Sequence, residues 1–204
     1  MRAFLAGAPG HPCMYEVELK VRADHATVRD RLEAIDATRI GTVRQVDTYF
    51  DAPDRDFAET DEALRIRQES ESGETDPTVA ITYKGPLVDD ESKTREEAET
   101  RVGDGHEMRA ILGGLGYEPA ATVSKERTRY SVDSCTVTLD QVEDIGEFVE
   151  VEVETERDLE AGDAAADDAL EDLRGDAEAV LERLGLDPAD GIRTSYLGLL
   201  LADG

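Results

Sequence analysis

The stretch Glu16-Val17-Glu18-Leu19-Lys20 alternates charged and apolar residues, and this alternation decides the fold that the sequence predicts. Because successive side chains of a strand point to opposite faces of a sheet, the charged residues share one face and the two apolar residues share the other. The pattern recurs at residues 64–67, 81–84, 125–129 and 148–154. All five segments therefore predict strands that have one ionic face and one apolar face.

A single strand of this kind is typical of a sheet with one solvated face. Five of them, carrying both signs of charge, also fit a barrel whose ionic faces point inward, and helices must then cover the apolar outside. The lumen of such a barrel would gather arginines, lysines and carboxylates. It would form a pocket suited to a metal-bound polyanion.

Further segments complete this fold. Besides residues 16–20, strands are expected at 42–50, 63–68, 78–84, 93–101, 121–130, 136–140 and 147–155, in a mostly antiparallel order. Asp24 predicts the start of one helix, and Gly116 predicts the end of another over residues 107–115. An apolar stripe from Leu159 to Leu184 and the apolar residues 192–201 predict helices that cover the outside of the barrel. The expected fold class is α+β, with an eight-stranded antiparallel β-barrel or tunnel, a polar ionic lumen and helices outside.

The length of 204 residues fits one domain with a sizeable core. Residues 1–13 contain Gly and Pro without periodicity, so we expect an unstructured extension, and Met14 could be the natural start. Residues 14–201 are expected to form a single domain whose helical C-terminal part is residues 158–201.

Acidic residues outnumber basic ones by 49 to 22, and the net charge is −27. This charge argues against binding to nucleic acid or to an anionic membrane, because both depend on neutralisation by Lys and Arg. Such an acidic chain with few lysines also indicates adaptation to concentrated salt, where screening relieves self-repulsion. Cys13 and Cys135 form no CxxC motif, and no apolar run is long enough for a membrane span, so we expect a cytoplasmic protein.

Several short motifs occur in a fixed order along the chain. They are ExExK at 16–20, DTYFD at 47–51, LRIR at 64–67, YKGP at 83–86, KTREEAE at 93–99, KER at 125–127, and LD at 139–140 followed by GEFVEVE at 146–152. Together they resemble the CYTH superfamily, the triphosphate tunnel metalloenzymes, which includes class IV adenylate cyclases and thiamine triphosphatases. The resemblance leans toward the cyclase branch, and it implies an eight-stranded tunnel in which basic residues bind a triphosphate and carboxylates hold Mg²⁺ or Mn²⁺.

The resemblance also implies individual roles. The implied triphosphate ligands are Lys20, Arg65, Arg67, Lys84, Arg95, Lys125 and Arg127, and the three lysines Lys20, Lys84 and Lys125 are the implied catalytic residues. The implied metal ligands are Glu16, Glu18, Glu99, Asp140, Glu150 and Glu152. These residue types suit the chemistry, since Arg binds phosphate bidentately and hard divalent cations prefer oxygen ligands.

Three functions stay open at this point. The first is a class IV adenylate cyclase, which converts ATP to cyclic AMP and pyrophosphate. The second is a triphosphatase that hydrolyses thiamine triphosphate, a nucleoside triphosphate or inorganic triphosphate. The third is a non-catalytic module that binds polyphosphate or nucleotide. The expected partner is therefore ATP or another triphosphate, with no nucleic acid and no membrane, and Leu199, Leu200 and Leu201 could serve a homodimer interface.

Overall fold

The structure of the chain is a computed structural model, and it describes residues 15–71, 76–87, 95–155 and 164–203. The predicted extension at residues 1–13 and the beginning of the predicted C-terminal helical part therefore lie outside the described residues. Among the described helices, none is long and apolar enough to cross a membrane.

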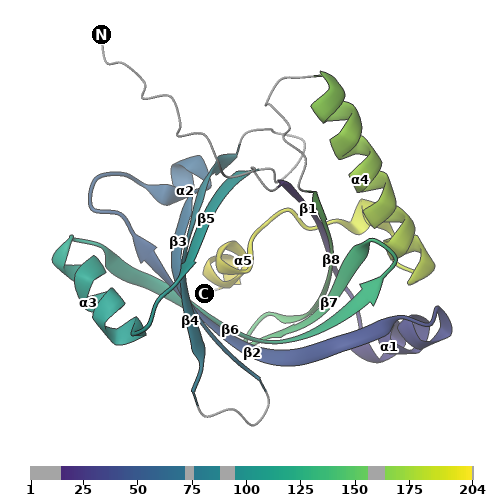
Figure 1. Cartoon of the computed structure of the whole chain (residues 1–204), viewed down its shortest axis with the longest axis horizontal. Coiled ribbons are helices and arrows are strands. Elements are labelled where there is room, and N and C mark those ends of the chain that lie inside the picture. The colour runs from purple at the N-terminus through teal and green to yellow at the C-terminus, as the bar shows by residue number, and fades with distance from the viewer. Residues whose placement is uncertain (1–14, 72–75, 88–94, 156–163, 204) are drawn as a thin grey trace.

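Eight antiparallel strands form one sheet in the order β1-β8-β7-β6-β2-β3-β4-β5. The strands are β1 (Tyr15–Arg22), β2 (Thr38–Asp51), β3 (Ala63–Glu71), β4 (Thr78–Leu87), β5 (Arg95–Arg101), β6 (Glu118–Val132), β7 (Cys135–Val142) and β8 (Gly146–Thr155). The sheet curves around a central space (Figure 1), and within the described residues no ladder joins the end strands β1 and β5. The predicted α+β fold with eight antiparallel strands is confirmed, as a curled sheet rather than a hydrogen-bonded ring.

The register of the strands keeps the ionic faces together. In the pairing of β1 with β8, Lys20 lies opposite Glu150 and Glu18 lies opposite Glu152, while the intervening Leu19 lies opposite Val151. Because the side-chain period is two, one matched pair fixes the face of every other residue in both strands. Charged side chains therefore line the inside of the curl, and apolar ones face outward.

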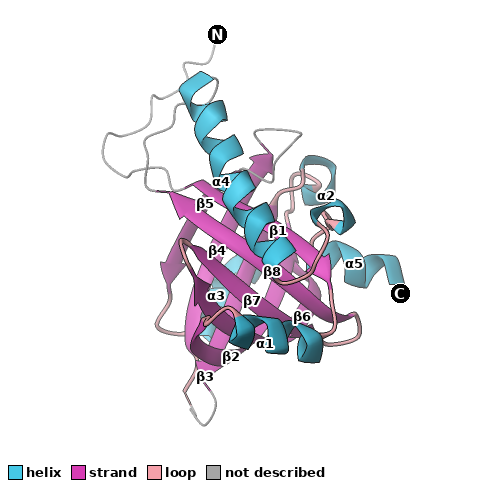
Figure 2. Cartoon of the chain, turned by 90° about the vertical axis from the view of Figure 1, so that its right-hand side faces the viewer, coloured by secondary structure: helices cyan, strands magenta, loops and turns pink. Residues whose placement is uncertain are grey.

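Two helices cover the outer face of β1, β7 and β8. Helix α1 (His25–Ala34) begins at Asp24, whose carboxylate accepts a hydrogen bond from the Thr27 backbone N–H. Helix α4 (Ala164–Arg183) crosses the outside of these strands (Figure 2). Leu32 of α1 and Leu181 of α4 are buried in one cluster with Val151, so the predicted covering of the sheet by helices is observed here.

A second outer cluster covers the other half of the sheet. Helix α3 (Gly105–Gly114) contributes Leu112, and the short helix α2 (Phe57–Thr60) contributes Phe57, both packed with Ile66 of β3. Gly116 follows α3 with a φ of 93°, a left-handed conformation that favours glycine, as its predicted role as a helix stop requires. Helix α2 lies in a segment for which the sequence predicted no helix.

The C-terminal segment departs from the prediction. After the 3-10 helix η1 (Pro188–Asp190), helix α5 (Tyr196–Asp203) does not cover the outside of the barrel. It lies at one end of the curled sheet (Figures 1 and 2), where Tyr196 packs with Val123, Val142 and Phe148. These strand residues lie on the inner face, which is apolar at this end, and an apolar helix buries them from water.

Candidate active site

Arg127 is the centre of a buried ion network on β6, β7 and β8. Its Nε and one terminal nitrogen donate to the two oxygens of Asp140, at 2.7 and 2.6 Å. The same terminal nitrogen donates to Glu150, and the other donates to Glu152 at 3.2 Å. A guanidinium with five donors in a planar fork can hold several carboxylates at once, and burial makes each ion pair stronger than it would be in water.

Two lysines flank this arginine. Lys125 Nζ donates to Asp140 at 3.0 Å, and Lys20 Nζ lies 3.6 Å from Glu150 and 3.5 Å from Glu18. Both ammonium groups are almost fully buried, with 4% and 3% of the side chain exposed. Burial, with the neighbouring Arg127, lowers the pKa of Lys125 to about 8, although Asp140 opposes the shift.

Three carboxylates of β1 and β8 converge. One oxygen from each of Glu18, Glu150 and Glu152 lies within 4.8 Å of the others. Burial raises the pKa of Glu152 to about 7, and the charges of Glu150 and Glu18 add to the rise, while Arg127 opposes it. Arg127 and Lys20 balance part of this negative charge, and the carboxylate oxygens are donors of the kind that Mg²⁺ and Mn²⁺ prefer. These three residues therefore fit a divalent metal ion.

The residues described so far, on β1, β6, β7 and β8, form one wall of the lumen. The facing wall, on β2 and β3, repeats part of the ion network around Arg127. Arg67 donates two hydrogen bonds of 2.7 Å to Asp47, and Arg65 lies 3.5 Å from the same carboxylate. Burial alone would raise the pKa of Asp47, but the two arginines lower it to about 2. The buried Arg65 Nε has no hydrogen-bond partner within the described part of the chain, an uncommon state for a buried donor.

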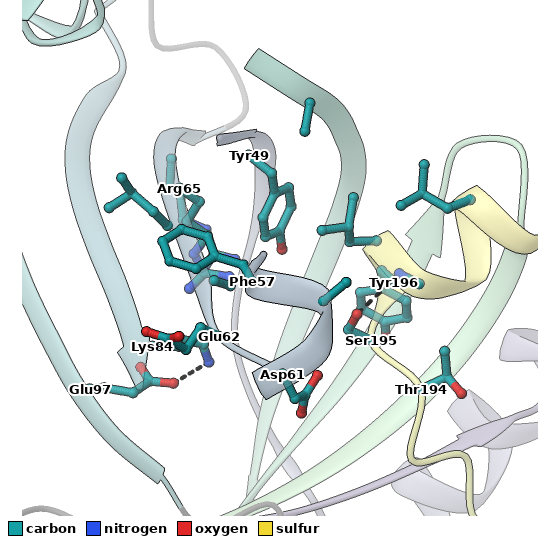
Figure 3. A pocket seen from close by; sticks show the side chains of 18 of the residues that line it. Tyr49, Phe57, Asp61, Glu62, Arg65, Lys84, Glu97, Thr194, Ser195 and Tyr196 are labelled. Atoms are coloured by element: carbon teal, nitrogen blue, oxygen red, sulfur yellow. Dashed lines mark hydrogen bonds and ion pairs between the residues drawn. The ribbon is translucent and has the colours of Figure 1, made fainter. Parts of the chain in front are cut away.

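The outer end of this wall is more exposed. Lys84 of β4 pairs with Glu97 of β5, and Thr82 donates to Glu99 at 2.7 Å. About a quarter of the Lys84 side chain (26%) is exposed. Figure 3 shows Lys84 and Glu97 on one side of the pocket and Ser195 and Tyr196 on the other.

A cavity of about 650 Å³ lies between the two walls. This volume falls within the range of roughly 300–1,000 Å³ that is usual for small-molecule sites. Its ionic lining includes Glu18, Lys20, Arg65, Arg67, Lys84, Glu97, Glu99, Lys125, Arg127, Glu150 and Glu152. Asp47 and Asp140 are not among the described residues that line the cavity, because each lies behind the arginine that it binds.

The structure brings six of the expected triphosphate ligands to this cavity: Lys20, Arg65, Arg67, Lys84, Lys125 and Arg127. Of the expected metal ligands, Glu18, Glu150 and Glu152 form one group, whereas Glu99 bonds to Thr82 and Asp140 is held by Arg127 and Lys125. The expected ligands Glu16 and Arg95 belong to β1 and β5, and their side chains lie outside the described part of the structure.

Sequence reasoning missed Asp47 and Tyr196. Asp47 stands in the quoted DTYFD motif, and its period-two spacing from Gln45 and Tyr49 was a signal that it faces the lumen. Tyr196 carried no such signal, because its place depends on where the C-terminal segment runs in space.

An antiparallel sheet curls around a cavity that has basic walls and three converging carboxylates, and this arrangement suits a polyanion. The chain belongs to the CYTH domain family, whose model matches residues 14–196. It is 37% identical to the protein named "Putative adenylate cyclase MJ0240" of Methanocaldococcus jannaschii, over 91% of this chain and 98% of that protein. It is 31% identical to adenylate cyclase CyaB of Aeromonas hydrophila, over 89% of this chain and 86% of that protein.

Solved structures share the fold. The PH1819 protein of Pyrococcus horikoshii is 35% identical, with a TM-score of 0.78, and the match covers 93% of this chain and all of that one (100%). The protein named "Putative adenylyl cyclase HpAC1" from Hippeastrum, described as having a dominant triphosphatase activity, is 18% identical, with a TM-score of 0.65 over 93% of this chain and 96% of that one. At that identity the second likeness concerns the fold alone.

Proposed function

We propose that this chain is a divalent-metal-dependent adenylate cyclase that converts ATP to cyclic AMP and pyrophosphate. The observation that carries the proposal is the cavity, in which six basic side chains on two facing walls stand beside the group Glu18, Glu150 and Glu152. The names of the two CYTH relatives support the cyclase reaction in particular.

The basic residues bind the phosphates from both sides. Lys20, Lys125 and Arg127 stand on one wall, and Arg65, Arg67 and Lys84 stand on the other, so a triphosphate between the walls meets positive charge on each phosphoryl group. Asp140 and Asp47 keep the arginines in place from behind, without occupying the cavity. Such fixed donors stabilise the charge that develops on the leaving pyrophosphate without reorganising during the reaction.

Glu18, Glu150 and Glu152 would hold Mg²⁺ or Mn²⁺, and when bound the metal supplies Lewis acidity that activates an attacking hydroxyl and neutralises phosphate charge. Arg127 orients Glu150 and Glu152 by donating to both, and Lys20 lies between Glu18 and Glu150. In the cyclase reaction the ribose 3′ oxygen bonds to the α-phosphorus, the bond from that phosphorus to the bridging oxygen breaks, and the hydroxyl proton passes to solvent.

A triphosphatase is the second candidate, because the same phosphate-binding walls would serve hydrolysis with water as the attacking group. The Hippeastrum protein, which shares the fold, is described with that activity. A non-catalytic binding module is the third candidate. It has less support, because anion binding needs the basic residues but does not need three converging carboxylates.

Product analysis separates these functions. Purified protein is incubated with ATP and Mg²⁺ or Mn²⁺ in molar KCl, since the chain is strongly acidic, and the nucleotides are then separated. Cyclic AMP with pyrophosphate is the expected result, and EDTA should abolish it. Release of ADP and phosphate would instead identify the protein as a triphosphatase. If ATP, thiamine triphosphate and inorganic triphosphate all survive, and triphosphate binding is indifferent to EDTA, the chain is a binding module.

A further inference from the structure

The C-terminal segment is attached to the candidate site at Lys20 itself. The Ile192 N–H donates to the Lys20 backbone carbonyl at 2.7 Å, which joins this segment to β1 beside the catalytic cavity. Ser195 then starts α5, because its hydroxyl accepts from the Gly198 N–H at 3.1 Å. These bonds bring Tyr196, the first residue of the helix, into the lumen.

The ring of Tyr196 contacts both buried lysines of the site. The Nζ of Lys20 lies 4.5 Å from the ring centroid, and the Nζ of Lys125 lies 4.8 Å from it. Phe148 packs edge-on against the same ring, with 5.0 Å between centroids, and so fixes its plane. Each ammonium group therefore has a carboxylate as one partner and the electron-rich ring as another, which restricts a flexible side chain to one direction.

The hydroxyl of Tyr196 has a different role from the ring. Only 7% of the residue is exposed, and the hydroxyl is buried without a hydrogen-bond partner in the described residues. Burial raises its pKa, and Glu150 and Asp140 raise it further, so the hydroxyl keeps its proton and remains a donor. Tyr196 lines the cavity, so a phosphate oxygen that reaches its hydroxyl there would supply the missing acceptor.

We infer that Tyr196 is a positioning residue of the triphosphate site, whose ring aligns the ammonium groups of Lys20 and Lys125 and whose hydroxyl donates to the bound phosphate chain. This inference rests on the proposed function, because it assumes that the cavity binds a triphosphate. It assigns a role in the site to Tyr196, for which the sequence motifs implied no role.

Two substitutions separate the ring from the hydroxyl. Tyr196→Phe keeps the ring and removes the donor, whereas Tyr196→Leu keeps apolar bulk and removes both. The affinity for inorganic triphosphate, measured by calorimetry with Mg²⁺ in molar KCl, should fall a few-fold in Tyr196→Phe and by about tenfold more in Tyr196→Leu. The kcat for ATP should depend on the ring more than on the hydroxyl, so it should fall mainly in Tyr196→Leu.

Leu200→Ala is the matched control, because Leu200 packs beside the same apolar cluster from α5 and is not among the described residues that line the cavity. It should lower the melting temperature and leave triphosphate affinity within about twofold of wild type.

If Tyr196→Leu only lowers the melting temperature, as Leu200→Ala does, with unchanged affinity, the inference is overturned and the proposed function stands. If wild type binds triphosphate without turnover, the proposed enzymatic function fails, and the affinities of the two variants still decide the role of Tyr196. If wild type binds no triphosphate, both are overturned.

Discussion

The two walls of the cavity contain the same arrangement with different surroundings. On the first wall Asp140 binds Arg127 through two hydrogen bonds with Lys125 beside it, and on the second wall Asp47 binds Arg67 in the same way with Arg65 beside it. An aspartate placed behind an arginine fixes the fork of the guanidinium and leaves its remaining donors toward the lumen. Both walls therefore present arginines that are already oriented.

The walls differ in what surrounds this common unit. The first wall adds Glu18, Glu150 and Glu152, whose oxygens converge, and its residues Lys20, Asp140 and Glu150 are almost completely buried. The second wall leaves the Arg65 Nε without a partner among the described residues, and its Lys84–Glu97 pair is partly exposed. A surplus of carboxylates suits a metal, and spare donors suit phosphate. Under the proposed function, the metal would therefore lie at the first wall and the far end of the phosphate chain at the second.

The largest effect is expected when a substitution disrupts the ion network of the first wall. Arg127→Met should lower the free energy of unfolding by about 3–5 kcal/mol, because it leaves Asp140, Glu150 and Glu152 buried without their shared partner. The measurement is urea unfolding in molar KCl. The matched variant is Arg67→Met on the second wall, where 17% of the side chain is exposed and the loss should be smaller. Equal losses in the two variants would remove the difference in burial as the explanation.

The next effect concerns the metal. Glu150→Gln should reduce metal-dependent turnover by about 100-fold or more while the fold is kept, since the neutral amide is a poor ligand for a hard cation. Initial rates with Mg²⁺ and Mn²⁺ and a far-UV circular dichroism spectrum test both parts. The control is Glu126→Gln, an exposed residue on β6, which should match wild type. Wild-type rates in Glu150→Gln would take Glu150 out of the site.

A smaller effect should appear in the pH dependence of the metal-free protein. Burial raises the pKa of Glu152 to about 7 from an ordinary value of 4.5, so between these values the folded state binds more protons than the unfolded state. Stability should therefore fall as the pH rises through this window, and this contribution should level off above it. Glu152→Gln should remove that part of the slope. The test is urea midpoints of both proteins in EDTA from pH 4 to 8, and superimposable slopes would contradict the raised pKa.

The smallest effect on stability is expected at the exposed end of the second wall. Lys84→Met should change the free energy of unfolding by less than about 1 kcal/mol, because its pair with Glu97 is partly solvated. The same change should raise the KM for ATP several-fold, since it removes one positive charge from the phosphate path. Steady-state kinetics beside an unfolding curve tests both statements, and a large loss of stability would show that the walls are more alike than their burial indicates.

Much of the fold could be predicted from sequence because strand alternation is local. The period of two placed Glu18 and Lys20 on one face before any partner strand was known, and the Asp24 and Gly116 signals marked helix ends that the structure contains. The ends of strands were less predictable. β6 reaches Val132, whereas residues 121–130 were expected, because pairing with neighbouring strands extends an element beyond its own pattern.

The site was only partly predictable for a related reason. Glu150 and Asp140 have similar carboxylates in similar strands, and their motifs alone implied one role for both. In the structure Asp140 is fully occupied by Arg127 and Lys125 behind the cavity wall, whereas Glu150 reaches Glu18 and Glu152. That distinction depends on register and on depth in the sheet, which are properties of paired strands.

The sequence by itself determined which side chains share a face, because the direction of a strand side chain follows from its position in the chain. It also determined the excess of acidic residues and the ordered motifs of the CYTH family. The tertiary structure alone decided which carboxylates meet and which are held by arginines, and it brought Tyr196 onto Lys20 and Lys125. Several of these contacts join residues that are far apart in the chain, such as Glu18 with Glu150 and Lys20 with Tyr196. Only the curvature of the sheet and the path of the C-terminal segment determine such distances.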